Sequence, residues 1–367
     1  MDSTVRGVAK LRTHLVVLFG GRSAEHDVSC STAWHVCAAI DRNQHDVTLV
    51  GISREGEWNV TDDPFSGPET ALPDDGVLSP QGARTTPFEV VSHLRLTTTA
   101  PIVVVPLLHG PLGEDGTIQG LLEILDVAYV GSGVLGSAAA MDKSFAKTLV
   151  AAAGIPIPKH LTFRFSDHVQ IENISATVAE EFGYPCFVKP ANMGSSVGVS
   201  RVDDDNGLAA AVDTAFSYDS TILIEEGILG REIEVAILGN EDAVAFPPGE
   251  VIPADRFYSY SDKYLDGKST SAIPAELPAT DTEEIKRLAV AAFHALGCSG
   301  LARCDFFYEQ PGRGILFNEI NTMPGFTPIS MYPKMVAEGG MTYTELIDQL
   351  VDLALQRHAN RVRNTGS

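Results

Sequence analysis

Apolar runs alternate with segments of helical spacing over the first 133 residues of the chain. Short apolar runs that end in glycine or polar residues predict buried strands, and apolar residues three and four positions apart predict amphipathic helices. The expected strands lie at 15–21, 45–53, 101–110 and 127–133, and the expected helices at 23–41 and 117–126. Strands that alternate with helices in this way predict a parallel sheet.

Two further units follow the first. Their expected elements are a helix around 132–142, strands within 184–202 and at 220–228, a strand at 231–238, and a helical tail near 342–357. We therefore predict an α/β protein of three units, at 1–131, 132–225 and 226–367. Residues 61–87 are rich in Pro, Gly and Asp and have no period, so we expect them to form an exposed insertion or loop.

Composition limits the class of protein. The 367 residues are 44% hydrophobic with a net charge of −22, and no cluster of Lys and Arg suits a nucleic-acid partner. The five cysteines form no Cys-x-x-Cys pair, which argues against a disulfide framework or a zinc site and fits a reducing cytosol. We see no signal peptide and no apolar run of the ~18 residues that a membrane span needs. These features predict a cytoplasmic protein without a membrane partner.

The segment "HGPLGEDGTIQG" at 109–120 follows an expected strand with one imidazole, two adjacent carboxylates and four glycines. A plain turn needs fewer glycines, so we interpret this loop as one that brings the backbone close to a small charged molecule. A second glycine motif, "GSGVLG" at 131–136, matches a dinucleotide fingerprint but lacks the acidic residue expected ~20 positions later. We interpret it as a structural turn, and an oxidoreductase would rest on this motif alone.

The segment "FVKPANMGSSVGVS" at 187–200 places Lys189 at the end of an apolar strand, before a loop of small residues. Such residues expose backbone N–H groups to an anion, and the lysine adds a positive charge. We favour a lid over phosphates; the alternative is an ordinary hairpin with a flexible tip. The lysine precedes the glycines and no helix is expected to follow, so this is not a Walker A loop.

The segment "GLARCDFFYEQPGRGILFNEIN" at 300–321 predicts a hairpin whose loop is centred near Gly312. With a period of two, Asp305 lies opposite Glu319, and Arg303 lies opposite Asn321. The other face carries apolar residues that can enter a core: Ala302, Cys304, Phe306, Leu316 and Ile320. Two carboxylates and an amide oxygen on one face suit Mg²⁺, and the alternative is a solvated face with ion pairs.

Two other segments are more ambiguous. "LIEEGILGREIEV" at 223–235 holds Glu225, Glu226 and Glu232, which fit either nucleotide contacts or a polar surface. "FYSYSDKYLDGKS" at 257–269 fits either a loop that closes over an active site or a surface loop packed by its own tyrosines.

Together these segments resemble the D-alanine–D-alanine ligases of the ATP-grasp superfamily over residues 14–357. "HGPLGEDGTIQG" and residues 296–325 carry the resemblance, and "GGRSAEHDVS", "MDK" and "KYL" occur in the family's order. The resemblance implies an ATP-grasp fold. It also implies ATP-dependent ligation of two D-alanines through an acyl phosphate, for peptidoglycan precursors. The family is usually dimeric, so it implies a homodimer.

The resemblance also implies residue roles. For the first D-alanine they are His109 near the substrate and Glu25 at its ammonium group, with Glu25, Ser195 and Tyr264 as a hydrogen-bonded triad. For ATP, the resemblance places Lys143, Lys189 and the lid with Ser196 at the phosphates. It places Glu225, Glu226 and the backbone to Ile228 at adenine, and Glu232 at ribose. For two Mg²⁺ ions, with Mn²⁺ as an alternative, they are Asp305, Glu319 and Asn321. For the oxyanion they are Arg303 and the Gly325 N–H, and for phosphate and the second carboxylate Lys263 and Ser330.

Three rival interpretations stay open at this point. The chain could be another ATP-grasp ligase, one that makes D-alanyl-D-lactate or a specialised dipeptide. It could be a binding module that keeps the fold without catalysis, although the presence of Arg303, Asp305, Glu319 and Asn321 argues against that. The third is the oxidoreductase.

Overall fold

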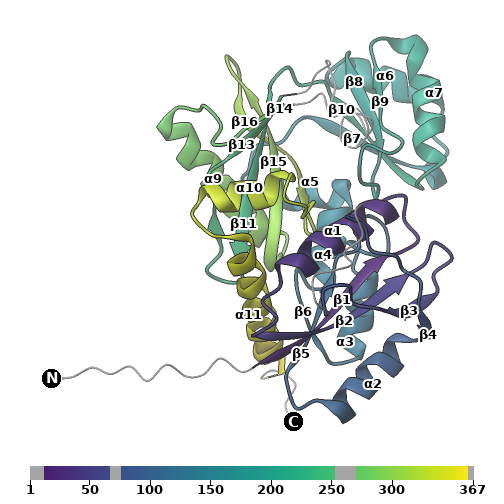
Figure 1. Cartoon of the computed structure of the whole chain (residues 1–367). Helices are drawn as coiled ribbons and strands as arrows, with labels where there is room; N and C mark the ends of the chain where they lie inside the picture. The colour runs from purple at the N-terminus through teal and green to yellow at the C-terminus, as the bar shows by residue number, and fades with distance from the viewer. Residues whose placement is uncertain (1–11, 67–75, 253–269, 363–367) are drawn as a thin grey trace.

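The computed structural model describes residues 12–66, 76–252 and 270–362. Three sheets with helices against them make up the molecule (Figure 1). The predicted α/β class and the parallel N-terminal sheet are confirmed, because β1 pairs in parallel with both of its neighbours.

The first sheet has the strand order β4-β3-β2-β1-β5-β6, with β3 and β4 antiparallel at one edge. Its strands are β1 (Thr13–Gly20), β2 (His45–Ile52), β3 (Trp58–Thr61), β4 (Ala83–Thr85), β5 (Ile102–Pro106) and β6 (Ala128–Tyr129). Its helices are α1 (His26–Ala39), α2 (Pro87–Thr97) and α3 (Thr117–Ile124). Leu15 and Val17 pack into the core on one face of β1, and Val16 and Leu18 into the core on the other. Burial on both faces explains why this strand is a continuous apolar run.

The second sheet is antiparallel, with the order β7-β10-β8-β9. Its strands are β7 (His160–Arg164), β8 (Cys186–Pro190), β9 (Ser200–Val202) and β10 (Thr221–Glu226). The helices that lead into it and flank it are α4 (Val134–Met141), α5 (Lys143–Ala152), η1 (Phe165–Asp167), α6 (Ile171–Glu181) and α7 (Asp205–Phe216). Val188 and Ile224 pack into the core formed with α6 and α7. Because strand side chains alternate, Lys189 and Glu225 occupy the opposite face.

The third sheet has the order β14-β13-β11-β15-β16, with β12 paired to β11. Its strands are β11 (Arg231–Gly239), β12 (Val244–Ala245), β13 (Gly249–Ile252), β14 (Thr270–Ala272), β15 (Gly300–Glu309) and β16 (Gly314–Asn321). Its helices are α9 (Ala279–Ala295), α10 (Met331–Glu338) and α11 (Tyr343–Val362). Helix α9 shares one core with β11, β15 and β16.

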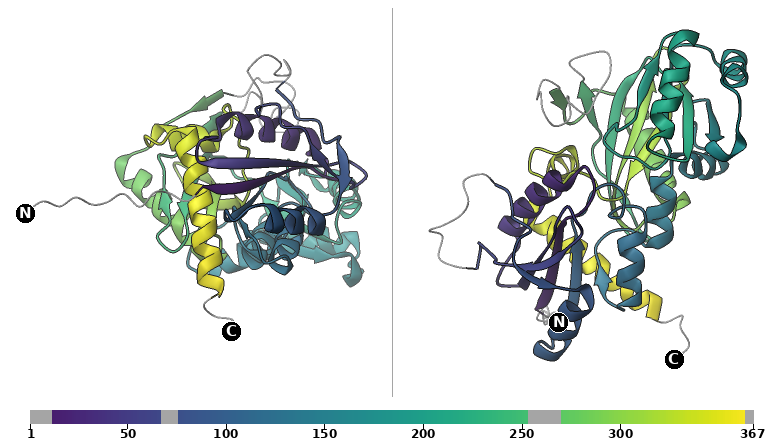
Figure 2. Two further views of the ribbon diagram at one scale, coloured as in Figure 1. Left: turned by 60° about the horizontal axis from the view of Figure 1, so that its bottom comes forward. Right: turned by 90° about the vertical axis from the view of Figure 1, so that its right-hand side faces the viewer.

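Helix α11, near the C-terminus, packs against the first sheet; Figure 2 shows this yellow helix beside the purple strands. The Arg357 guanidinium lies 4.1 Å from the ring centroid of Tyr129, and His45 Nε2 lies 2.9 Å from Asp348 Oδ1. The predicted divisions at 131/132 and 225/226 stay a prediction. Within the described ranges, no helix is long and apolar enough to cross a membrane.

The segment expected to be an exposed loop at 61–87 is partly ordered against the first sheet, so that prediction is wrong in part. Strand β4 extends the sheet edge, and Leu78 is buried in the core. A Cβ at Gly51 would lie 2.4 Å from the Cα of Pro80, so this segment packs directly on β2. Scattered apolar residues in a Pro-rich and Gly-rich stretch are enough to anchor it, although they have no period.

Candidate active site

The end of the first sheet holds the acidic part of the site. Strands β1 and β5 are parallel, so the segments that follow them lie at the same edge. Glu25 comes from the turn after β1 and is buried. Ser23 Oγ donates a hydrogen bond of 2.7 Å to the carbonyl oxygen of His109, which ties this turn to the loop after β5.

Gly110 explains why the loop after β5 contains glycine. Its φ is 71°, and a Cβ at this position would lie 2.5 Å from Glu25 Oε2. The glycine therefore meets two demands, because it adopts a left-handed conformation and lets the backbone approach a buried carboxylate.

The loop after β8 reaches across to the same carboxylate. Ser195 Oγ donates a hydrogen bond to Glu25 Oε1, which joins the second unit to the first. Ser195 and Ser196 have φ values of 49° and 59°, a backbone region that L-residues other than Asn and Asp seldom adopt. The structure thus brings together two members of the expected triad. The third, Tyr264, and the predicted substrate residue Lys263 lie outside the described residues.

His109 is buried and held through both ring nitrogens. Nδ1 lies 3.1 Å from the carbonyl oxygen of Met323, and Nε2 lies 3.3 Å from Thr32 Oγ1. Burial lowers the pKa of His109, while the charge of Glu25 and the Met323 carbonyl oppose that shift. The neutral ring of His109 therefore forms part of the pocket wall. Its contact with the Met323 carbonyl also links the chain after β16 to the first sheet.

Glu114 is an acidic residue of this loop to which the sequence analysis assigned no role. Its carboxylate accepts hydrogen bonds from the backbone N–H groups of Gly110 at 2.6 Å and Met323 at 3.2 Å. Burial and the nearby charge of Glu25 raise the pKa of Glu114 to about 8, against the effect of these N–H donors. Glu114 is therefore a neutral carboxylic acid at pH 7, beside Glu25 and the expected position of the ammonium group.

A buried trio of charges lies on the open face of the second sheet. Glu225, on β10, is between two lysines: Lys189 Nζ lies 2.5 Å from Oε2, and Lys147 Nζ lies 3.1 Å from Oε1. Burial opposes ionisation of Glu225, but the two ammonium groups outweigh it and lower its pKa. Lys147, from α5, was not among the predicted site residues. Burial lowers its pKa to about 8, against the attraction of Glu225.

Lys143 begins the same helix and faces the third sheet. Its Nζ donates 2.7 Å to the carbonyl oxygen of Met193 in the lid loop and lies 3.4 Å from Glu319 Oε2. One side chain therefore touches both the lid and an expected metal ligand.

The hairpin of β15 and β16 has the predicted pairing at its chemical end. Asp305 is opposite Glu319 and Arg303 is opposite Asn321. The register shifts between Asp305 and Phe306, which pair with Glu319 and Phe317, so Asn318 has no partner residue. The expectation that Leu316 shares the core face with Cys304 is therefore wrong. The extra residue reverses the alternation, and Leu316 pairs with Phe307 instead.

The face of this hairpin carries an ordered charge network. Arg303 binds Asp305 through two hydrogen bonds of 2.8 and 2.7 Å, and its Nε lies 3.1 Å from Glu234 Oε2. Burial works against the charge of Arg303, but Asp305 and Glu234 raise its pKa well above the usual range. Asn321 Nδ2 donates 3.0 Å to Asp305 Oδ2, which leaves the Asn321 amide oxygen as an additional donor atom for a cation.

This donor set fits Mg²⁺, because it offers carboxylate and amide oxygens on one face, and Mg²⁺ takes few protein ligands and completes its shell with water and phosphate. Within the described residues, no group of three or more His, Cys, Asp and Glu side chains could hold a metal ion by itself. Asn321 and the phosphates of a nucleotide would have to complete the shell.

The remaining predicted residues lie around this centre. A Cβ at Gly325 would lie 3.0 Å from Ser330 Oγ, so these two are adjacent. Glu226 accepts 2.6 Å hydrogen bonds from the Lys159 N–H and from Arg313 Nη1, which fixes the strand end before Ile228. Glu232 pairs with Phe307 in the third sheet.

A small cavity of about 30 Å³ lies where the three units meet. It is lined by Glu114 from the first unit, Lys143 and Gly194 from the second, and Glu319 and Asn321 from the third. Parts of the chain that are distant in sequence therefore converge on one polar space.

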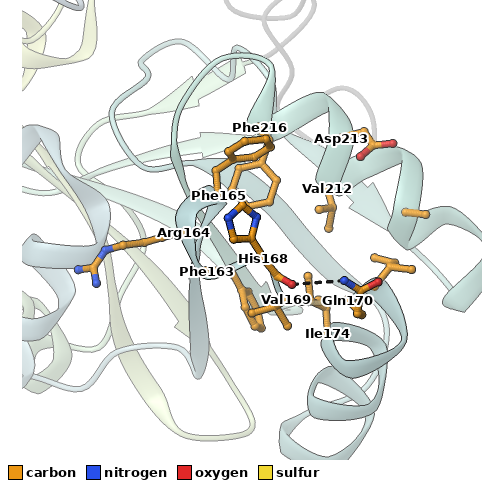
Figure 3. Close-up of a pocket in the computed structure, with 12 residues that line it drawn as sticks. Phe163, Arg164, Phe165, His168, Val169, Gln170, Ile174, Val212, Asp213 and Phe216 are labelled. Carbon is orange, nitrogen blue, oxygen red and sulfur yellow. Dashed lines mark hydrogen bonds between the residues drawn. The ribbon is translucent and has the colours of Figure 1, made fainter.

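Two other cavities hold less chemistry. One, of about 350 Å³, lies between β7, α6 and α7, and Figure 3 shows its aromatic lining of Phe163, Phe165 and Phe216. It contains none of the predicted site residues. The other, of about 210 Å³, is mainly apolar, and its lining includes Trp58, Leu108 and His109.

Comparisons with known proteins show the family of the chain. Residues 14–132 match the family described as D-ala D-ala ligase N-terminus, and residues 149–352 match D-ala D-ala ligase C-terminus. A D-alanine--D-alanine ligase of Acetivibrio thermocellus is 44% identical over 371 residues, or 96% of this chain and 98% of that protein. A D-alanine--D-alanine ligase A of Mesorhizobium japonicum is 44% identical over 368 residues, or 96% and 100%. The chain belongs to the D-alanine–D-alanine ligase family.

Solved structures place the ligase in the same fold. The D-alanine-D-alanine ligase of Coxiella burnetii superimposes with a TM-score of 0.80 at 32% identity, covering 96% of each chain. The VanG D-Ala:D-Ser ligase of Enterococcus faecalis gives 0.77 at 34% identity, covering 94% of this chain and 99% of its own. The predicted ATP-grasp fold is thereby confirmed.

Three residues of the ligase site were missed from the sequence: Lys147, Glu114 and Glu234. Lys147 follows Lys143 by four positions, which places both on one helix face and was a usable signal. Glu114 was within the quoted motif, but one of its hydrogen bonds comes from Met323, more than 200 residues away. Glu234 pairs with Asp305 through β11, a strand pairing that no local pattern predicts.

Proposed function

We propose that the ligase joins two D-alanines at the expense of ATP, through an acyl phosphate, to supply a peptidoglycan precursor. The observation that carries this is the junction of the three units. There Glu25 and Glu114 of the first unit lie beside the lid, while Lys143 of the second faces Glu319 of the third. An amino acid and a nucleotide held on opposite sides of this junction would meet at it.

The first D-alanine would bind between the first unit and the lid. Its ammonium group would face Glu25, which Ser195 orients, and the wall would be formed by His109. The protonated state of Glu114 would limit the negative charge there to one carboxylate. The substrate carboxylate would then point towards the cavity at Lys143 and Glu319.

ATP would bind between the second and third sheets. Lys143, Lys189 and the lid with Ser196 would contact phosphates, Glu225 and the backbone from Glu226 to Ile228 would bind adenine, and Glu232 would bind ribose. Asp305, Glu319 and Asn321 would hold Mg²⁺, which offsets charge on a transferring phosphoryl group. The Arg303 bonds to Asp305 fix that carboxylate in place before nucleotide arrives.

The chemistry proceeds in two transfers. A carboxylate oxygen of the first D-alanine attacks the γ-phosphorus, the bond to the β-phosphate oxygen breaks, and ADP leaves. The amine of the second D-alanine attacks the activated carbonyl. Arg303 and the Gly325 N–H would stabilise the oxyanion, and Ser330 and Lys263 would bind phosphate and the second carboxylate. Collapse of this intermediate breaks the bond from carbon to the phosphate oxygen and releases the dipeptide.

We also propose that the ligase works as a homodimer in the cytoplasm. The expected partners are two D-alanine molecules, ATP and Mg²⁺, without nucleic acid or membrane. Size-exclusion chromatography with light scattering measures the oligomeric state, and a monomer at working concentration would contradict this part.

The experiment that tests the function combines purified protein with ATP, Mg²⁺ and D-alanine and measures phosphate and dipeptide. Parallel reactions replace half of the D-alanine with D-lactate or D-serine, because ester-forming and D-Ala:D-Ser ligases share the fold. We expect D-alanyl-D-alanine as the main product and phosphate release that depends on D-alanine. Release without D-alanine would contradict the assignment, and a mixed product as the main one would change the second substrate.

A further inference from the structure

Lys147 is the most completely buried charged side chain near the site, with 0% of its surface exposed. It comes from the middle of α5 and reaches Glu225 Oε1 at 3.1 Å and the carbonyl oxygen of Asn318 at 3.0 Å. A lysine that is removed from water needs partners of this kind, because an uncompensated buried charge is strongly unfavourable.

The first partner of Lys147, Glu225, also binds Lys189, so Glu225 and the phosphates of ATP would compete for the Lys189 ammonium group. Lys189 lies 2.5 Å from Glu225 Oε2, and the same ammonium group is the one proposed to contact phosphate. When Lys189 turns to phosphate it weakens its bond to Glu225, whose side chain is only 3% exposed. Without a second cation, Glu225 would be left as an isolated buried carboxylate, and that cost would keep Lys189 on Glu225.

The second partner of Lys147, the Asn318 carbonyl, lies in the β15–β16 hairpin that carries the expected metal ligands. Asn318 is the residue of the bulge in β16 that has no partner residue in β15, and its carbonyl oxygen accepts a hydrogen bond from Lys147. Glu319 is the next residue. Lys147 therefore connects β10 of the second sheet to the residue beside an expected metal ligand.

From these contacts we propose that Lys147 is a positioning residue for ATP: it balances the charge of Glu225, so that Lys189 is released to the phosphates. The inference rests on the proposed function, specifically on Lys189 as a phosphate ligand. Lys147 itself touches no substrate in this account and acts through Glu225 and Lys189.

The test is calorimetric titration of the full-length ligase with Mg²⁺-ATP and, separately, with adenosine, which lacks the phosphates. Loss of one member of a buried charge pair commonly changes a binding constant on the order of 10- to 100-fold. We expect Lys147→Met to weaken ATP binding by this amount. Adenosine binding should be unchanged, because Lys189 still pairs with Glu225 when no phosphate is present and keeps this carboxylate beside adenine. Lys286→Met is the matched control, since Lys286 is a lysine whose Nζ bonds Glu283 within helix α9, away from the proposed nucleotide contacts. Its ATP affinity should equal that of wild type.

Two results would overturn the inference: unchanged ATP affinity in folded Lys147→Met, or equal loss for ATP and adenosine, which is what a merely structural role gives. Lys189→Met separates this from the proposed function. If that variant binds ATP normally, the phosphate role of Lys189 fails; if it binds weakly while Lys147→Met binds normally, only the present inference fails.

A double variant keeps the test valid if Lys147→Met folds poorly. With Glu225→Gln no carboxylate competes for Lys189, so adding Lys147→Met to that background should change ATP affinity little. If the two substitutions weaken ATP additively, Lys147 does not act through Glu225.

Discussion

Replacing Gly110 with alanine separates backbone strain from damage to the substrate site. The residue has φ 71°, and a non-glycine residue in the left-handed region costs about 1–2 kcal/mol. In addition, the new Cβ would lie 2.5 Å from Glu25 Oε2. Normal contact distances require a displacement of the carboxylate of about 1 Å. An error of that size in a substrate-binding group can cost on the order of 10²-fold in rate.

Gly154→Ala is the matched control. Gly154 has a φ of 78°, and a Cβ there would meet nothing within 4 Å, so it experiences only the strain. We expect both variants to lose about 1–2 kcal/mol of unfolding free energy in urea titrations. Only Gly110→Ala should lose kcat/KM for D-alanine, while its KM for ATP stays near that of wild type. Equal kinetics in the two variants would refute the claim that the loop after β5 is built around the Glu25 carboxylate.

The other predictions concern the β15–β16 hairpin, Glu114 and Tyr264. Asp305→Asn or Glu319→Gln should lower turnover on the order of 10²-fold or more while the fold survives, and full phosphate release in either folded variant would contradict the proposed metal site. Because the pKa of Glu114 is about 8 in the fold and near its ordinary 4.5 when unfolded, the folded state holds the extra proton between these values. Unfolding free energy should therefore fall as pH rises through that window and should fall less in Glu114→Gln; parallel curves would show that the acid is ionised at neutral pH. Tyr264→Phe should reduce dipeptide synthesis and increase D-lactate use, most visibly below neutral pH, whereas an unchanged product ratio would show that Tyr264 does not set selectivity.

The sequence was most informative where chemistry and strand period coincide. The parallel first sheet, the loop after β8 and the pairing of Asp305 with Glu319 follow from apolar runs and a period of two. The pairing of Asp305 with Glu319 was predicted correctly partly because two errors cancel. The loop is centred half a residue before Gly312, and the bulge at Asn318 restores the pairing beyond it. Leu316, which lies between the two, was placed on the wrong face for the same reason.

The parts that the sequence did not predict depend on distant contacts. Glu114 accepts a hydrogen bond from Met323, and the burial of Lys147 depends on its contacts with Glu225 and Asn318. Leu78 is anchored by a core to which α1 and α11 contribute. No local pattern encodes such partners, because each is set by how whole units pack.

The central claim is that the carboxylate of the first D-alanine is activated by phosphoryl transfer at the junction of the three units. It is tested most directly with D-alanine labelled with ¹⁸O in its carboxylate, incubated with ATP and Mg²⁺ in ordinary water. The account predicts that this carboxylate attacks the γ-phosphorus and that its carbon–oxygen bond then breaks. Each phosphate released should therefore carry one ¹⁸O atom, and the new peptide carbonyl should keep the other. Phosphate without ¹⁸O, formed alongside the dipeptide, would contradict the account.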